Sequence, residues 1–251
     1  MARQIAQVPI TGTLDDITFY MTEESGFLAR MKTSLDANRL KNDPRFEGSR
    51  RAYTEFGRAS AGAGLLRRTM VIAGKELSDT RIVSRLTARL VSVTGTDTSN
   101  LKGERLLDNA DLSGLVGFEW NKKQAWGGVC RFEPVCRIDA GSGMMEVAIP
   151  KLSKSSFTAP LGATHYELIM EGGGVCFGDD KTEGVAEHVT GGTGWKRLNT
   201  ASPAQVLDGK VAVAEGRRLM VGVGVRFGED VNGEVRALNR IGVAFFIGAV
   251  V

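Results

Sequence analysis

The side chains with the widest chemical range in this chain are two histidines and three cysteines. His165 and His188 have no second histidine or cysteine at a metal-ligand spacing, and the HExxH pattern is absent. The cysteines form neither an even set nor a CxxC pair, so we interpret them as buried thiols rather than as disulfides or zinc ligands. They are Cys130, Cys136 and Cys176. These residues predict no metal site and no cofactor.

Glycine-rich segments are the usual phosphate-binding loops, but here none has the required context. Residues 191–196 lack the GxxxxGK[ST] spacing. Gly222-Val223-Gly224 lies inside an expected strand, whereas a dinucleotide-binding glycine motif leads from a strand into a helix. Residues 172–174 are interpreted as a bulge or bend in a strand. No GxSxG elbow is present either. The sequence therefore predicts no catalytic residues and a protein that is not an enzyme.

Arginine is the residue type whose pattern admits a function. Residues 28–105 contain sixteen Lys or Arg against eight Asp or Glu, although the net charge of the chain is only +3. The candidate interface arginines are Arg50, Arg51, Arg58, Arg67, Arg68, Arg81, Arg85 and Arg89. They could form a solvated or salt-bridged face, contact a protein partner or bind nucleic acid, and the sequence leaves these three interpretations open.

A β-hairpin is expected at residues 10–31, where apolar residues alternate with Thr18 and Tyr20 before a turn at Gly26. An isolated two-stranded hairpin is marginal in water, so this one needs a surface to pack on. Phe19 and Tyr20 are therefore candidate interface residues.

Two helices are expected after the hairpin. Asp43 is an expected N-cap with Pro44 at the first helical position, and apolar residues at helical spacing continue to Met70. A second helix is expected from Ser78 or Asp79 to Gly95, with a shorter helical segment at 108–115.

From residue 122 onward the pattern is typical of β-strands separated by turns. The fold class expected is α+β, with an N-terminal hairpin and helical region (residues 1–121) followed by a mainly antiparallel β-sandwich or jelly-roll-like domain (residues 122–251). The expected strands are residues 129–138, 144–149, 165–177, 185–189, 205–214, 219–227 and 235–250. Trp126 and Trp195 are the candidate ligand contacts of this domain.

Three N-terminal motifs, ITGTLDDITFY at residues 10–20, GFLAR at 26–30 and NDP at 42–44, resemble an uncharacterised family of Bacteroidota proteins. That family opens with ITGTIGNVTFYK and GYLAR, starts a helix at NDP and carries an EFGRA segment, here residues 55–59. Residues 231–234 and 238–239 are similar to its final hairpin. Met21 stands where the family has a lysine. The resemblance implies no activity, cofactor or site residue.

The first residues show no signal-peptide pattern, and no apolar run is long enough to span a bilayer. We therefore expect a cytoplasmic protein, or one exported without an N-terminal signal. The function expected is structural: a non-enzymatic protein whose main partner is another copy of itself, in a homo-oligomer or larger assembly. One alternative is a β-sandwich binding module for a protein or carbohydrate. A second is a nucleic-acid-associated protein that uses the basic helices.

Overall fold

The computed structural model describes residues 2–5, 8–32, 37–178, 184–238 and 242–251. Its chain divides into two compact units, Met1–Arg50 and Arg51–Val251. Each unit is described by itself below.

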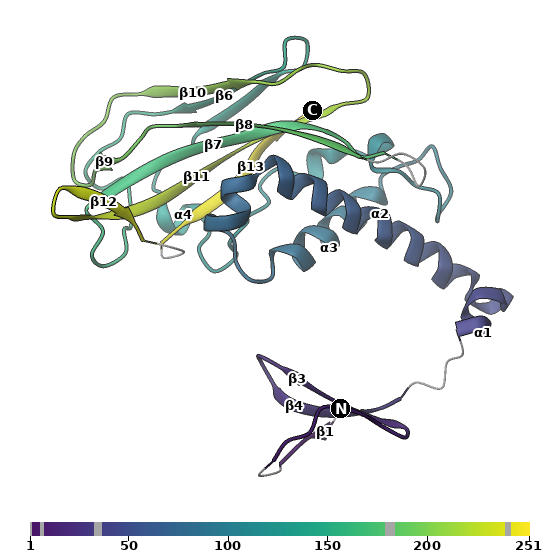
Figure 1. The fold of residues 1–251 in the computed structure, drawn as a ribbon. Helices are drawn as coiled ribbons and strands as arrows, with labels where there is room; N and C mark the ends of the chain where they lie inside the picture. The colour runs from purple at the N-terminus through teal and green to yellow at the C-terminus, as the bar shows by residue number, and fades with distance from the viewer. Residues whose placement is uncertain (1, 6–7, 33–36, 179–183, 239–241) are drawn as a thin grey trace. The chain divides into compact units, whose positions relative to one another are not determined.

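The N-terminal unit contains a four-stranded antiparallel sheet in the order β1-β4-β3-β2 (Figure 1). Its strands are β1 (Ala2–Arg3), β2 (Gly12–Leu14), β3 (Ile17–Thr22) and β4 (Gly26–Met31). The expected hairpin is the β3–β4 pair, in which Thr22 lies opposite Gly26 and Ile17 opposite Met31. Gly26 has a φ of 71°, a left-handed conformation that glycine adopts without strain. Two short strands extend the hairpin into a sheet.

The helical segments begin close to where the sequence predicts them. Asp43 Oδ1 accepts a hydrogen bond from the backbone N–H of Arg45 at 3.0 Å, which confirms Asp43 as an N-cap. Asp79 Oδ1 accepts one from Arg81 at 2.9 Å, immediately before helix α3. The helical segments are α1 (Ala37–Asn42), η1 (Pro44–Phe46), α2 (Glu47–Thr69), the π-helix η2 (Ala73–Leu77), α3 (Ile82–Thr94), η3 (Leu107–Asn109), η4 (Leu112–Leu115) and α4 (Trp126–Val129).

Two antiparallel sheets make up the rest of the Arg51–Val251 unit. A three-stranded sheet has the order β10-β6-β5, and a six-stranded sheet has the order β12-β11-β7-β8, with β13 on β11 and β9 on β7. The strands are β5 (Val135–Asp139), β6 (Met144–Ile149), β7 (His165–Cys176), β8 (Val185–Gly192), β9 (Lys196–Arg197), β10 (Gln205–Lys210), β11 (Arg218–Val231), β12 (Glu234–Ala237) and β13 (Ala244–Val250).

The six-stranded sheet lies between two hydrophobic cores. Helices α2 and α3 cover one face, where Leu66 and Leu86 pack in the same cluster as Phe245 of β13 (Figure 1). The three-stranded sheet covers the other face, where Val147 shares a cluster with Val223. The α+β class with a sandwich-like β-region is thereby confirmed.

The helices and the six-stranded sheet share one hydrophobic core, so the chain does not divide at residue 122. Because α2 and α3 bury their apolar faces against the six-stranded sheet, the helices and the sheet belong to one unit, and the expected boundary at residues 121–122 falls inside it. The structure instead divides the chain after Arg50, within helix α2.

The glycine triplet of β7 forms no bulge, contrary to the interpretation from sequence. Residues 172–174 pair in unbroken register with both β11 and β8. A Cβ on Gly173 would lie 1.9 Å from the carbonyl oxygen of Glu187, and one on Gly172 would lie 2.5 Å from Met145 Sδ. The glycines are required because neighbouring elements approach the strand closely from both faces.

Two of the expected strands are rearranged in the structure, and a third, expected at residues 205–214, ends at Lys210. Residues 126–129 form α4, and β5 begins only at Val135, after Pro134, because proline lacks the N–H that a strand ladder uses. The expected strand at 235–250 is two strands, β12 and β13, both paired with β11. Residues 239–241 between them lie outside the described residues.

Candidate functional site

One face of the N-terminal sheet is entirely apolar. Residues directly opposite each other in a ladder project to the same face, and side chains alternate along each strand. Ile17 pairs with Met31 and Leu14, and Met21 pairs with Phe27. The side chains that share this face are those of Ala2, Leu14, Ile17, Phe19, Met21, Phe27, Ala29 and Met31. We call this set the apolar sheet face.

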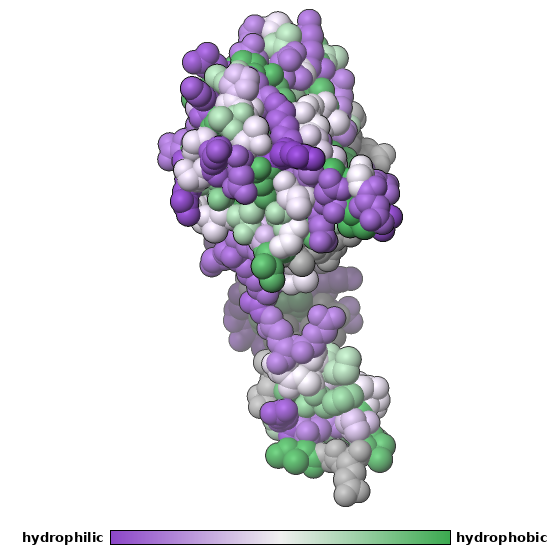
Figure 2. Space-filling view, turned by 90° about the vertical axis from the view of Figure 1, so that its left-hand side faces the viewer, coloured by the Kyte–Doolittle hydropathy of each residue, from purple (hydrophilic) through white to green (hydrophobic). Residues whose placement is uncertain are grey.

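The apolar sheet face is not covered by the described residues of its own unit. None of its eight residues is buried, and the exposed fractions of Leu14, Met21 and Met31 are 64%, 58% and 70%. Apolar atoms accordingly reach the surface of this unit in Figure 2. A contiguous exposed apolar patch is typical of an interaction surface, because a chain that stayed alone would hold it in water at a cost in free energy.

The opposite face of the sheet is mainly polar. Thr18 lies opposite Arg30, and its hydroxyl oxygen is 3.4 Å from that of Thr13. The Arg30 guanidinium lies 5.6 Å from the ring centre of Tyr20. The two residues singled out from sequence therefore separate: Phe19 lies on the apolar sheet face, and Tyr20 on the polar one.

Three of the candidate arginines bind main-chain carbonyls of their own unit. Arg50 donates to the carbonyls of Leu40 and Asp43, both at 2.9 Å. Arg58 donates to those of Gly103 and Arg105 at 3.1 and 3.2 Å. Arg85 has the same kind of role. In these positions the guanidinium groups hold loops in place.

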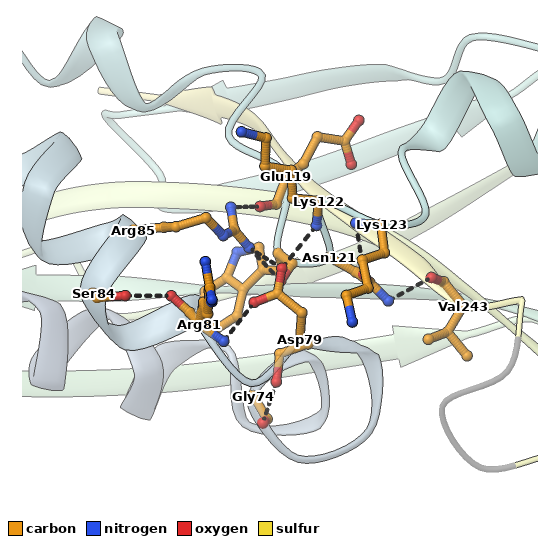
Figure 3. Close-up of polar contacts among 12 residues, drawn as sticks. Gly74, Asp79, Arg81, Ser84, Arg85, Glu119, Asn121, Lys122, Lys123 and Val243 are labelled. Carbon is orange, nitrogen blue, oxygen red and sulfur yellow. Dashed lines mark hydrogen bonds and ion pairs between the residues drawn. The ribbon is translucent and has the colours of Figure 1, made fainter. Parts of the chain in front are cut away.

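Arg85 is the centre of the polar cluster drawn in Figure 3. Its guanidinium donates to the carbonyls of Glu119 and Trp120 at 2.7 and 2.8 Å and forms an ion pair with Asp79 at 2.9 Å. Asp79 Oδ2 also accepts from the backbone N–H of Lys122 at 3.0 Å. The cluster thus fastens the segment 119–122 to the start of helix α3.

The remaining candidate arginines lie on the surface of the helices. Arg51, Arg67 and Arg68 on α2, and Arg81 and Arg89 at α3, are all exposed. The four-residue repeat of Arg81, Arg85 and Arg89 therefore contains one half-buried arginine, Arg85, and two exposed ones.

The two candidate tryptophans have different environments. Trp195 packs under Arg226, whose guanidinium lies 5.2 Å from the ring centre and also donates to Glu167 at 2.9 Å. Trp126 is 6% exposed, and its indole N–H donates to the carbonyl of Phe132 at 2.9 Å. Trp126 also lines a pocket of about 540 Å³.

Sequence reasoning missed a buried carboxylate, Glu171 of β7. Its oxygens accept the backbone N–H groups of Ile72 and Ala73 at 2.7 and 2.6 Å, and His188 Nε2 lies 3.3 Å from Oε1. Burial raises the pKa of the Glu171 carboxyl. The contact joins the sheet to the π-helix η2. The available signal was that Glu171 interrupts a run of apolar and glycine residues from 168 to 176.

No group of three or more His, Cys, Asp or Glu residues is placed to hold a metal ion in the described part of the chain. Among the described residues, no helix has both the length and the apolar character that crossing a bilayer demands.

Comparison with protein-family models, curated proteins and solved structures finds no match for this chain. The fold and the site define it as an α+β protein with a sandwich-like β-region. Its N-terminal sheet exposes an apolar face.

Proposed function

We propose that the protein is a structural component that self-associates, and that the apolar sheet face is where its copies meet. The observation that carries this proposal is that none of the eight residues of that face is buried, and five of them are exposed, on a four-stranded sheet. Sheets of this kind become stable when their apolar face is covered by another layer.

A second copy of the same face is the partner with the simplest chemistry. The face contains no charged residue, so two copies packed together would bury no unpaired charge. Two antiparallel sheets pack face to face at a separation of roughly 10 Å, with interdigitating side chains. A two-fold axis through such a contact would cover both faces at once.

The arginines support the nucleic-acid alternative less well. Arg50, Arg58 and Arg85 direct their guanidinium groups at main-chain carbonyls, which reduces the cations available for phosphates. We therefore favour an assembly held by apolar contact.

Light scattering after size exclusion tests the proposal on the full chain. The test variant is Ile17→Glu, which places a charge on the apolar sheet face, and the matched control is Thr18→Glu, one residue along β3 and opposite Arg30. We expect a discrete oligomer for the wild type and for Thr18→Glu, and a monomer for Ile17→Glu.

Salt distinguishes the type of contact. An apolar interface persists as salt is raised, whereas an interface of exposed arginines weakens through screening. A wild-type chain that stays monomeric at every concentration contradicts the proposal. Dissociation by salt, with Ile17→Glu still oligomeric, would move the interface to the arginines.

A further inference from the structure

A pocket of about 540 Å³ lies beside helix α4, in the Arg51–Val251 unit. Three aromatic side chains line it, those of Trp126, Phe132 and Phe246. The Trp126 ring meets those of Phe132 and Phe246 at centroid distances of 5.5 and 5.2 Å, in edge-on arrangements. Pockets of this volume with aromatic walls are typical of small-molecule sites.

The pocket also contains a carboxylate, that of Glu119. Its Oε1 accepts the backbone N–H of Trp126 at 3.0 Å, which fixes the side chain beside α4. Its Oε2 is buried and has no hydrogen-bond partner in the described part of the chain. An unpartnered carboxylate oxygen is costly to keep in this state.

Arg85 acts on the Glu119 carboxyl through its charge and not through a direct ion pair. Arg85 donates to the main-chain carbonyl of Glu119, and within the described ranges no salt bridge reaches the carboxylate itself (Figure 3). Burial raises the pKa of the Glu119 carboxyl, and the same burial, together with Glu119, raises that of the neighbouring Cys130 thiol. The other charged residues that line the pocket are Arg131 and Glu133, which have opposite charges, so an ionised Glu119 leaves the lining with a net negative charge.

We propose that this pocket binds a small organic cation, a protonated amine attached to an apolar or aromatic body. The ammonium group supplies the N–H donor and the positive charge that Glu119 lacks, and charge-assisted hydrogen bonds are the stronger kind. The aromatic side chains supply apolar contact for the body and a favourable field for the cation.

Two adjacent glycines of α4 allow this pocket to be closed selectively. A Cβ built on Gly127 or on Gly128 meets no atom within 4 Å, and neither residue has a left-handed backbone. Of these two glycines, Gly127 lines the pocket and Gly128 does not. A larger side chain at residue 127 therefore fills the pocket, and the same side chain at residue 128 is a matched control.

The test is calorimetric titration of the full-length chain with benzylamine at neutral pH, beside neutral benzyl alcohol and anionic benzoate. We expect benzylamine to bind at least about tenfold more tightly than benzyl alcohol, from one charge-assisted hydrogen bond, and benzoate not to bind. Glu119→Gln should remove the preference for the amine. Gly127→Leu should abolish binding, and Gly128→Leu should leave it unchanged.

Thermal unfolding of each variant separates loss of the pocket from loss of the fold. If Gly127→Leu does not fold, the smaller Gly127→Ala should still weaken benzylamine binding relative to Gly128→Ala. Absence of benzylamine binding to the wild type overturns the proposal. Equal affinity for benzylamine and benzyl alcohol, or undiminished binding by a folded Gly127→Leu, does so too.

Discussion

In the Arg51–Val251 unit, helices α2 and α3 cover one face of the six-stranded sheet and the three-stranded sheet covers the other. In the N-terminal unit, none of the eight residues of the apolar sheet face is buried. Both sheets obey the same alternation of side chains, yet only the larger one has covering layers among the described residues of its own unit. The N-terminal sheet therefore carries a face of apolar residues, as a buried sheet does, although none of these residues is buried.

The largest expected effect is a loss of stability that occurs when a core residue is truncated in the larger unit but not when an apolar residue is truncated in the N-terminal unit. Phe245→Ala removes a fully buried ring from the helix-facing core and should lower the free energy of unfolding by about 3–5 kcal/mol. Phe19→Ala, on the apolar sheet face, should change that unfolding by less than about 0.5 kcal/mol. Urea unfolding followed by tryptophan fluorescence measures this, because Trp120, Trp126 and Trp195 all belong to the Arg51–Val251 unit.

If Phe245→Ala and Phe19→Ala lowered the free energy of unfolding equally in dilute solution, the two units would unfold together. The N-terminal sheet would then not be energetically separate from the larger unit.

The next effect tests how tightly the layers of the larger unit approach each other. Gly173→Ala places a Cβ 1.9 Å from a backbone oxygen and should cost about 3 kcal/mol, at the upper end of overpacking effects. Gly57→Ala on α2 meets no atom within 4 Å and should instead stabilise by about 0.5–1 kcal/mol. Thermal unfolding of the two variants should move in opposite directions. A neutral Gly173→Ala would mean that β7 and β8 are farther apart.

A smaller effect concerns the arginines. Arg85→Ala removes the guanidinium hydrogen bonds to the Glu119 and Trp120 carbonyls and the ion pair with Asp79, and should destabilise the larger unit by about 2 kcal/mol. Arg89→Ala, one helical turn later and exposed, should change stability by less than about 0.5 kcal/mol. Chemical denaturation provides both values. Equal changes in unfolding free energy for Arg85→Ala and Arg89→Ala would mean that the Arg85 hydrogen bonds do not stabilise the unit.

The smallest effect is a pH dependence at Glu119. Its folded-state pKa is raised by burial, so the carboxyl favours the folded state most below its ordinary pKa, and this contribution is lost as pH rises through the raised value. Glu119→Gln keeps an oxygen that can accept the Trp126 N–H but never ionises. Its stability relative to the wild type should therefore increase from acidic to neutral pH. Urea unfolding of both proteins from acidic to neutral pH measures this. If the Glu119 carboxylate were well solvated, the difference in unfolding free energy between variant and wild type would not change with pH.

The local parts of the fold could be predicted from sequence. Asp43-Pro44 and Asp79 mark helix starts because a capping carboxylate acts on N–H groups two residues away. The β3–β4 hairpin follows from the alternation around Gly26. Even the apolar sheet face was visible in Ile17, Phe19 and Met21, although its extension onto β2 required the register.

The non-local parts could not be predicted. Glu171 meets Ile72 and Ala73 across 99 and 98 residues, and Arg85 meets carbonyls 34 and 35 residues away. The charge pattern of α3 is the same whether an arginine faces solvent or a loop, so periodicity alone did not separate Arg85 from Arg89. The pocket beside α4 likewise brings Phe246 of β13 to residues between 117 and 134, which lie more than a hundred residues earlier in the chain.

The position of β13 along the chain has a consequence for the order of events during synthesis. Phe245 and Ile247 complete the core under the helices, so that core cannot close until residue 247 has been made. The N-terminal sheet needs only residues 2–31, and pairings between residues close in sequence form quickly. The apolar sheet face can therefore form while the larger unit is still being translated.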